Sequence, residues 1–249
     1  MTPHAEQAPE DSSEPAAAAA KVIAIDGPAG SGKSTVARAV ADRLNLPYLD
    51  TGAMYRSVAF AALRNGVDPE DTATVARLAR QLRIDVGERI VVDGTDATIE
   101  IRGPEVTRAV STVAANPEVR EELRHRQREW ATAHGGGVIE GRDIGSVVFP
   151  EAPLKVFLTA ADDERARRRY KEVTDLHYDG SSPGLAVEPE TSVEAVAAEL
   201  ARRDQADSTR TVAPLAIAEG AVVIDTTGHA IDDIVDDLLA RWLRLGEAT

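Results

Sequence analysis

Five short runs of apolar residues alternate along the chain with longer segments of helical periodicity. The apolar runs are residues 22–26, 47–50, 137–140, 154–159 and 222–225. Their apolar character is continuous, which is typical of parallel strands that are buried on both faces. The segments with helical periodicity are residues 33–44, 54–65, 117–134, 161–172, 192–203 and 231–245. This alternation predicts an α/β domain of three layers around a five-stranded parallel core sheet.

Three segments depart from the alternation. Residues 82–101 alternate between apolar and polar positions and contain two turn pairs, which predicts a small antiparallel meander inserted into the core. Residues 174–191 are rich in glycine, proline, serine and acidic side chains, and we expect a mobile surface loop between two helices. Residues 1–20 have no amphipathic period and are expected to form a disordered tail.

The charge balance of the chain limits its partners. The 249 residues include 42 acidic and 28 basic side chains, for a net charge of −14. Non-specific binding to nucleic acid or to anionic membranes needs clustered positive charge, so neither partner is expected. The chain has no cysteine, which excludes disulfides, thiolate metal sites and a cysteine nucleophile. No apolar run approaches the roughly 18 residues of a membrane span.

The first residues are acidic and polar, unlike a secretory signal, and we therefore expect a cytoplasmic protein. We also expect it to act as a monomer.

A glycine-rich loop carries the clearest chemical signal. Residues 27–34 fit the pattern G-x-x-x-x-G-K-[ST] between a predicted strand and a predicted helix. Glycines let successive backbone N–H groups point at phosphate oxygens, and the helix N-terminus adds its positive dipole end. Lys33 supplies a cation to the β- and γ-phosphates, and the Ser34 hydroxyl can bind Mg²⁺. The motif in this context predicts a site for a nucleoside triphosphate rather than a turn without a ligand.

Three further segments predict a second, phosphorylated ligand. Residues 50–56 and 141–145 follow the second and third predicted strands, and residues 203–210 close a late helix. Ligands of parallel sheets bind at the carboxyl ends of the strands. Arginine in each segment suits a phosphate because its planar fork binds two oxygens at once. The chain has no N-K-x-D segment of the kind that reads guanine, which argues against a GTPase.

Each of these segments also has a purely structural interpretation. Thr51 could simply cap the helix that begins near residue 53. Arg142 could form an ion pair with its neighbour Asp143. The residues at positions 203, 207 and 210 have the spacing of an ordinary solvated helix face.

Taken together, the motifs resemble the cytidylate kinase family in its long bacterial form. The segments that carry the resemblance are AIDGPAGSGKST, YLDTGAMYR, RAVSTVAANPEVR, GRDIGSVVFP, ERARRR and RRDQADSTR. It extends from Val22 to the end of the chain and implies an adenylate-kinase-like P-loop fold. The core would be residues 21–50 and 136–249, with an inserted region for the nucleoside monophosphate at about 51–135 and a lid at about 163–203. The family transfers the γ-phosphate of ATP to CMP or dCMP with Mg²⁺.

The resemblance also implies roles for individual residues. The ATP-binding residues would be Gly27, Pro28, Ala29, Gly30, Ser31, Gly32, Lys33, Ser34 and Thr35, with Ser34 at the metal. The CMP-binding residues would be Thr51, Tyr55, Arg56, Ser111, Arg120, Arg142, Asp143, Arg203, Asp207 and Arg210. The catalytic cations would be Lys33, Arg142, Arg165, Arg168 and Arg169, the last three facing the ATP phosphates from the lid. The sequence departs from the family at Glu140, at the end of the third strand, where the family often has Asp; Glu140 would position Mg²⁺ through a water or only orient Arg142.

The chemistry of cytosine fits three of these residues. Cytosine offers an amino donor at N4 and acceptors at N3 and O2, so Asp143 can accept from N4 while Arg120 and Ser111 donate. Uracil reverses two of these groups, and such a pairing discriminates by roughly 1–3 kcal/mol. Without the resemblance, the same residues would be interpreted as a salt-bridged carboxylate, a helix-surface charge and a hydroxyl with no ligand.

Two other functions compete with this one. The chain could be another P-loop kinase, acting on shikimate, gluconate, AMP or UMP. It could also be a nucleotide-sensing module without catalytic activity. Shikimate-type kinases usually lack the inserted meander, and a sensor would not need so many arginines around a second pocket.

Overall fold

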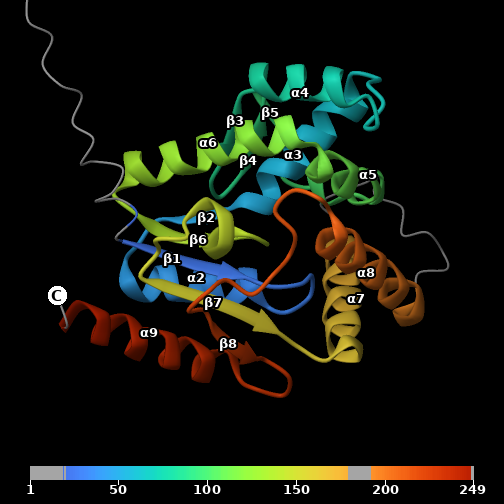
Figure 1. Cartoon of the computed structure of the whole chain (residues 1–249). Coiled ribbons are helices and arrows are strands. Elements are labelled where there is room, and N and C mark those ends of the chain that lie inside the picture. Colours follow the sequence, from blue (N-terminus) through green and yellow to red (C-terminus); the bar gives the residue numbers. More distant parts are fainter. Residues whose placement is uncertain (1–18, 20, 179–191, 248–249) are drawn as a thin grey trace, which may run out of the picture.

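A computed structural model describes residues 19, 21–178 and 192–247 and shows a five-stranded parallel sheet (Figure 1). The strand order is β2-β6-β1-β7-β8, and every neighbouring pair is parallel. The strands are β1 (Val22–Asp26), β2 (Tyr48–Asp50), β6 (Gly137–Glu140), β7 (Leu154–Thr159) and β8 (Val222–Asp225). The sheet confirms the predicted strands, apart from β2, which begins one residue after its predicted start at Pro47.

Helices cover both faces of the sheet, as the continuous apolar runs predict. One face packs against α2 (Lys33–Leu44) and α9 (Ile231–Glu247), where Ile25 and Val156 meet Val36 and Ile234. The opposite face packs against α3 (Thr51–Arg64) and α6 (Pro117–His134). The predicted three-layer α/β architecture is therefore confirmed.

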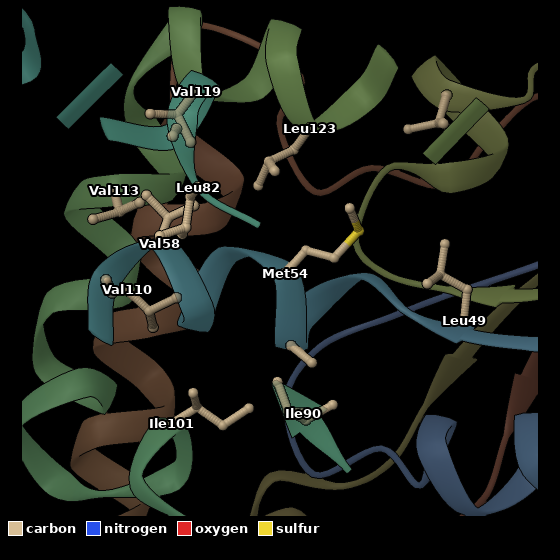
Figure 2. Packing of buried hydrophobic residues seen from close by; sticks show 14 of the residues in the cluster. Leu49, Met54, Val58, Leu82, Ile90, Ile101, Val110, Val113, Val119 and Leu123 are labelled. Carbon is tan, nitrogen blue, oxygen red and sulfur yellow. The ribbon is translucent and has the colours of Figure 1, made fainter. Parts of the chain in front are cut away.

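The chain makes a long excursion between β2 and β6. It contains α3, α4 (Thr72–Gln81), the strands β3 (Ile84–Val86), β4 (Ile90–Val92) and β5 (Thr95–Asp96), the 3₁₀ turn η1 (Glu100–Arg102), α5 (Pro104–Ala115) and α6. The three strands form a separate antiparallel sheet, which confirms the predicted meander. Buried side chains from the helices, η1 and β4 of this excursion share one core with the sheet; Figure 2 labels Leu49, Met54, Val58, Leu82, Ile90, Ile101, Val110, Val113, Val119 and Leu123 of that core.

The caps explain where the helices of this excursion begin and end. Asp50 caps α3 by accepting a hydrogen bond from the Ala53 N–H at 2.9 Å, so the suggestion that Thr51 is the cap is wrong. The helix consequently begins three residues earlier than its apolar period predicts. Asn116 accepts from two N–H groups in the first turn of α6, and Gly135 ends that helix with a φ of 69°. Helix α6 therefore begins and ends at the residues that the sequence predicts.

Helices α7 (Asp162–Tyr178) and α8 (Val193–Thr209) lie side by side beyond the carboxyl end of β1 (Figure 1). Helix α7 continues into the segment expected to be a loop, and the remainder of that segment, residues 179–191, lies outside the described residues. The predicted tail also lies outside them, except for Ala19, which is buried against the core. Among the described helices, none is long and apolar enough to cross a membrane.

Candidate active site

The sheet brings three functional segments to one edge. Asp50 of β2 and Ile25 of β1 are both in register with Glu140 of β6, so these three parallel strands end at the same level. The segments that follow them therefore open onto a shared cleft of about 250 Å³. Helices α5, α6, α7 and α8 supply its remaining walls.

The glycine-rich loop needs its glycines for conformation and for space. Gly30 and Gly32 have φ values of 75° and 87°, in the left-handed region that favours glycine. A Cβ atom on Gly27 would lie 2.0 Å from the backbone oxygen of Leu158, so a side chain at that position would collide with β7. The loop runs directly into the N-terminus of α2, an arrangement that suits phosphate oxygens.

Lys33 lies within this loop, where burial and a nearby arginine disfavour its positive charge. Its Nζ donates a hydrogen bond to the Pro28 carbonyl oxygen at 2.6 Å, and the side chain is buried. Burial, and then the positive charge of Arg142, lower the pKa of Lys33 to about 7. An ammonium group in this environment gains strongly from a nearby polyphosphate.

Next to the lysine, a hydroxyl and a carboxylate lie together. The Ser34 Oγ donates to Glu140 Oε2 at 3.0 Å, and the Tyr48 hydroxyl donates to Glu140 Oε1. Burial, and then the charge of Asp50, raise the pKa of the Glu140 carboxyl. Hard oxygen donors of this kind suit Mg²⁺, which usually keeps several waters and phosphate oxygens as ligands. Within the described ranges, no cluster of three or more histidine, cysteine, aspartate or glutamate side chains could hold a metal.

Arginines from distant parts of the chain converge on the other half of the cleft. The NH1 of Arg56 on α3 donates to the Ile101 carbonyl oxygen at 3.0 Å and to Thr107 Oγ1 at 2.9 Å. Burial, and then the charges of Arg203 and the other nearby arginines, hold the pKa of Arg56 well below its usual value. Burial and the charge of Arg142 likewise lower the pKa of Arg203 to about 10.

The lining of the cleft carries a surplus of positive charge. Eight cationic and five acidic side chains line it, although the whole chain has a net charge of −14. The cations are Lys33, Arg56, Arg102, Arg120, Arg142, Arg169, Arg203 and Arg210. The cleft is therefore suited to a small ligand that carries several negative charges.

A buried ion-pair group lies at the end of the cleft near α5 and α6. Arg120 NH2 lies 2.5 Å from Asp143 Oδ2, and Arg210 NH2 lies 3.5 Å from Asp143 Oδ1. The Arg120 guanidinium also lies over the Tyr55 ring, 5.5 Å from its centroid. Ser111 of α5 lines the same cleft. Each oxygen of Asp143 has two lone pairs, so these ion pairs leave room for a ligand donor.

Asp143 is salt-bridged, as the structural interpretation of that residue predicts, but Arg142 and the 203–210 segment differ from theirs. Arg142 is not paired with Asp143: its Nε donates to Asp207 Oδ2 at 2.9 Å and its NH1 to the Gly27 carbonyl oxygen at 2.7 Å. Glu140 accordingly contacts Ser34 and Tyr48 rather than orienting Arg142. Asp207 is only 8% exposed, so this side of α8 is not a solvated helix face. Burial raises the pKa of the Asp207 carboxyl, but the charge and hydrogen bond of Arg142, together with the charges of Arg210 and Arg203, lower it by more.

The cleft gathers most, but not all, of the predicted residues. All ten residues predicted to bind CMP line it, as do Ala29, Gly30, Gly32, Lys33, Ser34 and Thr35 of the loop. Of the lid arginines, Arg169 lines it, whereas Arg165 contacts the Ala29 carbonyl oxygen and Arg168 contacts Thr226. Sequence reasoning missed Arg102, which lines the cleft 3.5 Å from Asp50. The only feature of the sequence that could have indicated Arg102 is its position, as a charged side chain between an apolar segment and Gly103-Pro104.

A phosphate loop on a parallel α/β core, facing a basic pocket for a second ligand, defines a P-loop phosphotransferase. Comparisons with known proteins give the particular family. The model of the family described as cytidylate kinase matches residues 23–243. The chain therefore belongs to the cytidylate kinase family, which confirms the resemblance and makes it a nucleoside monophosphate kinase.

Individual relatives support this assignment over nearly the whole chain. A cytidylate kinase of Mycobacterium avium is 48% identical over 222 residues, which cover 87% of this chain and 92% of the relative. A cytidylate kinase of Desulforamulus reducens is 47% identical over 231 residues, or 91% of this chain and 98% of the relative. A cytidylate kinase of Limosilactobacillus reuteri is 46% identical over 221 residues, which cover 87% of this chain and 92% of the relative.

Proposed function

We propose that this protein transfers the γ-phosphate of ATP to CMP or dCMP and releases ADP with CDP or dCDP. The observation that carries this proposal is the surplus of arginine directly opposite the phosphate loop. Two phosphorylated ligands placed in the two halves of the cleft would meet end to end. Holding both reactants in line provides much of the catalysis in phosphoryl transfer.

On the donor side, the N–H groups of the loop would bind the ATP phosphates. Lys33 would move its Nζ from the Pro28 carbonyl oxygen to the β- and γ-phosphates. Ser34 would contact Mg²⁺ directly, and Glu140 would hold a metal-bound water beside it. The metal, when bound, neutralises charge that develops on the phosphate oxygens. Arg169 would face the transferred group from α7.

On the acceptor side, Arg56 and Arg142 would grip the phosphate of CMP, with Thr51 beside it. Arg203 and Asp207 of α8, and Arg210 directly after it, would bind the ribose and the phosphate. Asp143 would accept a hydrogen bond from the cytosine N4 group. Arg120 and Ser111 would donate to the cytosine acceptors.

The transfer itself needs no base. A phosphate oxygen of CMP attacks the γ-phosphorus, the bond to the β–γ bridging oxygen breaks, and its electron pair leaves with ADP. The attacking oxygen is already anionic, so no proton has to be removed. We propose that α7 and α8 act as a lid over the two nucleotides. Closure would exclude water and so limit hydrolysis of ATP.

An ADP-release assay over a panel of acceptors tests this proposal. Strong turnover with CMP and dCMP, and weak turnover with UMP, AMP, shikimate and gluconate, would support it. Preferred turnover with another acceptor would replace it by a different P-loop kinase activity. Binding of ATP without turnover on any acceptor would instead indicate a nucleotide sensor.

A further inference from the structure

Ala29, in the middle of the phosphate loop, is held from three directions by α7 and α8. Its side chain lies in a small apolar cluster with Ala166 of α7 and Leu200 of α8. Its carbonyl oxygen accepts a hydrogen bond from Arg165 NH1 at 3.0 Å. Its N–H donates a long hydrogen bond, 3.4 Å, to Asp204 Oδ1. The conformation of the loop at this residue therefore depends on these two helices.

Asp204 is the polar centre of this contact. Its Oδ2 lies 2.5 Å from Arg165 NH1, while its Oδ1 faces the Ala29 N–H. The side chains of Arg165 and Asp204 are 8% and 18% exposed, so water screens the pair only weakly. The next loop residue is equally constrained, because a Cβ atom on Gly30 would lie 2.8 Å from the Arg165 carbonyl oxygen.

Helix α8 reaches the same loop through a second carboxylate and arginine. Asp207 holds Arg142, whose NH1 donates to the Gly27 carbonyl oxygen at 2.7 Å. Asp204 and Asp207 of α8 thus each hold an arginine that donates to a carbonyl oxygen of the loop. The Asp204 partner binds the Ala29 carbonyl, and the Asp207 partner binds the Gly27 carbonyl. Asp207 lines the acceptor half of the cleft, whereas Asp204 lies outside it and beside the loop.

We propose that Asp204 is a positioning residue for the donor site: through Arg165 and Ala29 it holds the phosphate loop in the shape that binds the triphosphate. This inference rests on the proposed function, in which the loop binds ATP. A carboxylate near a polyphosphate site would weaken binding by repulsion if it acted only through its charge. Asp204 contacts a loop N–H and a buried arginine, and through them it strengthens ATP binding. The loop amides must be aligned before phosphate can bind, and these contacts keep them aligned.

The two possibilities predict opposite changes in ATP affinity when the charge of Asp204 is removed, so Asp204→Asn tests the proposal. This substitution keeps the shape of the side chain but weakens its hold on Arg165, and we expect the KM for ATP to rise about ten-fold. The KM for CMP should stay within about two-fold, because the acceptor residues are untouched. Glu199→Gln is the matched control, since it removes one acidic charge from an exposed ion pair on the same helix. It should leave the KM for ATP unchanged.

An ATP KM for the Asp204→Asn variant that is unchanged or lower than that of the wild type would overturn the proposal. A wild-type enzyme that shows no turnover with CMP would instead refute the proposed function, so the two failures are distinguishable. Hydrogen exchange of the loop amides without nucleotide gives an independent readout. Exchange around residue 29 should be faster in Asp204→Asn than in Glu199→Gln, and equal rates would also overturn the proposal.

A second variant covers the case in which Asp204→Asn does not fold. Arg165→Lys keeps the positive charge but removes the planar guanidinium, whose NH1 binds both Ala29 and Asp204 while its NH2 binds Asp162. It should raise the ATP KM to a similar extent. Where both single variants fold, the double variant should be no worse than the more severe of the two, because they disrupt one contact. Effects that multiply in the double variant would show that the two residues act separately and would contradict the proposal.

Discussion

The buried carboxyl of Asp26 allows a quantitative test of the structure through pH. Asp26 is the last residue of β1 and is 3% exposed. Its Oδ1 accepts from the Ile144 N–H at 2.9 Å and its Oδ2 from the Gly145 N–H at 2.7 Å. Burial raises the pKa of this carboxyl from 3.8 to about 6, although the two backbone hydrogen bonds lower it. Asp26 therefore holds the turn that follows Asp143.

The shift sets both the sign and the size of the effect on stability. A folded-state pKa above the unfolded value means that the folded state binds the proton more tightly. The contribution to stability is therefore fully present below pH 3.8 and is lost as the pH rises to about 6. At about 1.4 kcal/mol per pKa unit, the full loss is about 3 kcal/mol, and roughly half of it falls above pH 5.

Asp26→Asn isolates this contribution from those of the other titrating groups. Asparagine stays neutral, and its single oxygen can accept from only one of the two N–H groups, which costs about 1 kcal/mol at every pH. The free energy of unfolding of both proteins should be measured by urea titration at intervals from pH 3 to pH 8. The wild type should lose about 1.5 kcal/mol relative to the variant as the pH rises from 5 to 7.

The opposite slope would refute this reasoning. If the two N–H groups outweighed burial, the folded-state pKa would lie below 3.8 and the wild type would gain stability relative to the variant as the pH rises. A difference that does not change with pH would show that the carboxyl titrates equally in the folded and unfolded states.

Three further substitutions test the active site. Lys33→Ala should lower kcat at least about 100-fold, and normal activity would contradict the loop assignment. It should not lower the thermal midpoint of unfolding, because burial already disfavours the lysine charge. Asp143→Ala should reduce the preference for CMP over UMP roughly 10- to 100-fold, and an unchanged ratio would exclude base reading. Arg102→Ala should raise the KM for CMP about ten-fold but that for ATP less than about two-fold, and equal changes would argue against an acceptor role.

Local chemistry explains why much of the fold was predictable. The continuous apolar run at Val22–Asp26 identifies a buried strand, and the glycines after it identify the phosphate loop. The signals Asn116-Pro117 and Gly135 fix both ends of α6 because they act on the neighbouring backbone. Features that depend on a few adjacent residues can be inferred from a single sequence.

Contacts between distant residues were not predictable in the same way. The sequence offers Thr51 as a possible cap of α3, but Asp50 makes the hydrogen bond. Thr51 Oγ1 instead donates to the Glu140 carbonyl oxygen, 89 positions away. Helices α4 and α5 were not predicted. The position of Arg102 follows from the packing of the inserted region rather than from its neighbours in sequence.

The charge of the whole chain and the charge of its cleft serve different purposes. The net charge of −14 repels extended polyanions, whose many phosphates would lie along the surface. A mononucleotide is small enough to enter the cleft, where the guanidinium groups are close and the surface charge is screened within about 8 Å. Burial, and then the charges of the neighbouring arginines, lower the pKa of Arg56, so the charged group is disfavoured there without an anion. In the proposed function, binding of the acceptor phosphate would relieve that repulsion, so the arginines that destabilise the empty cleft would also hold the substrate.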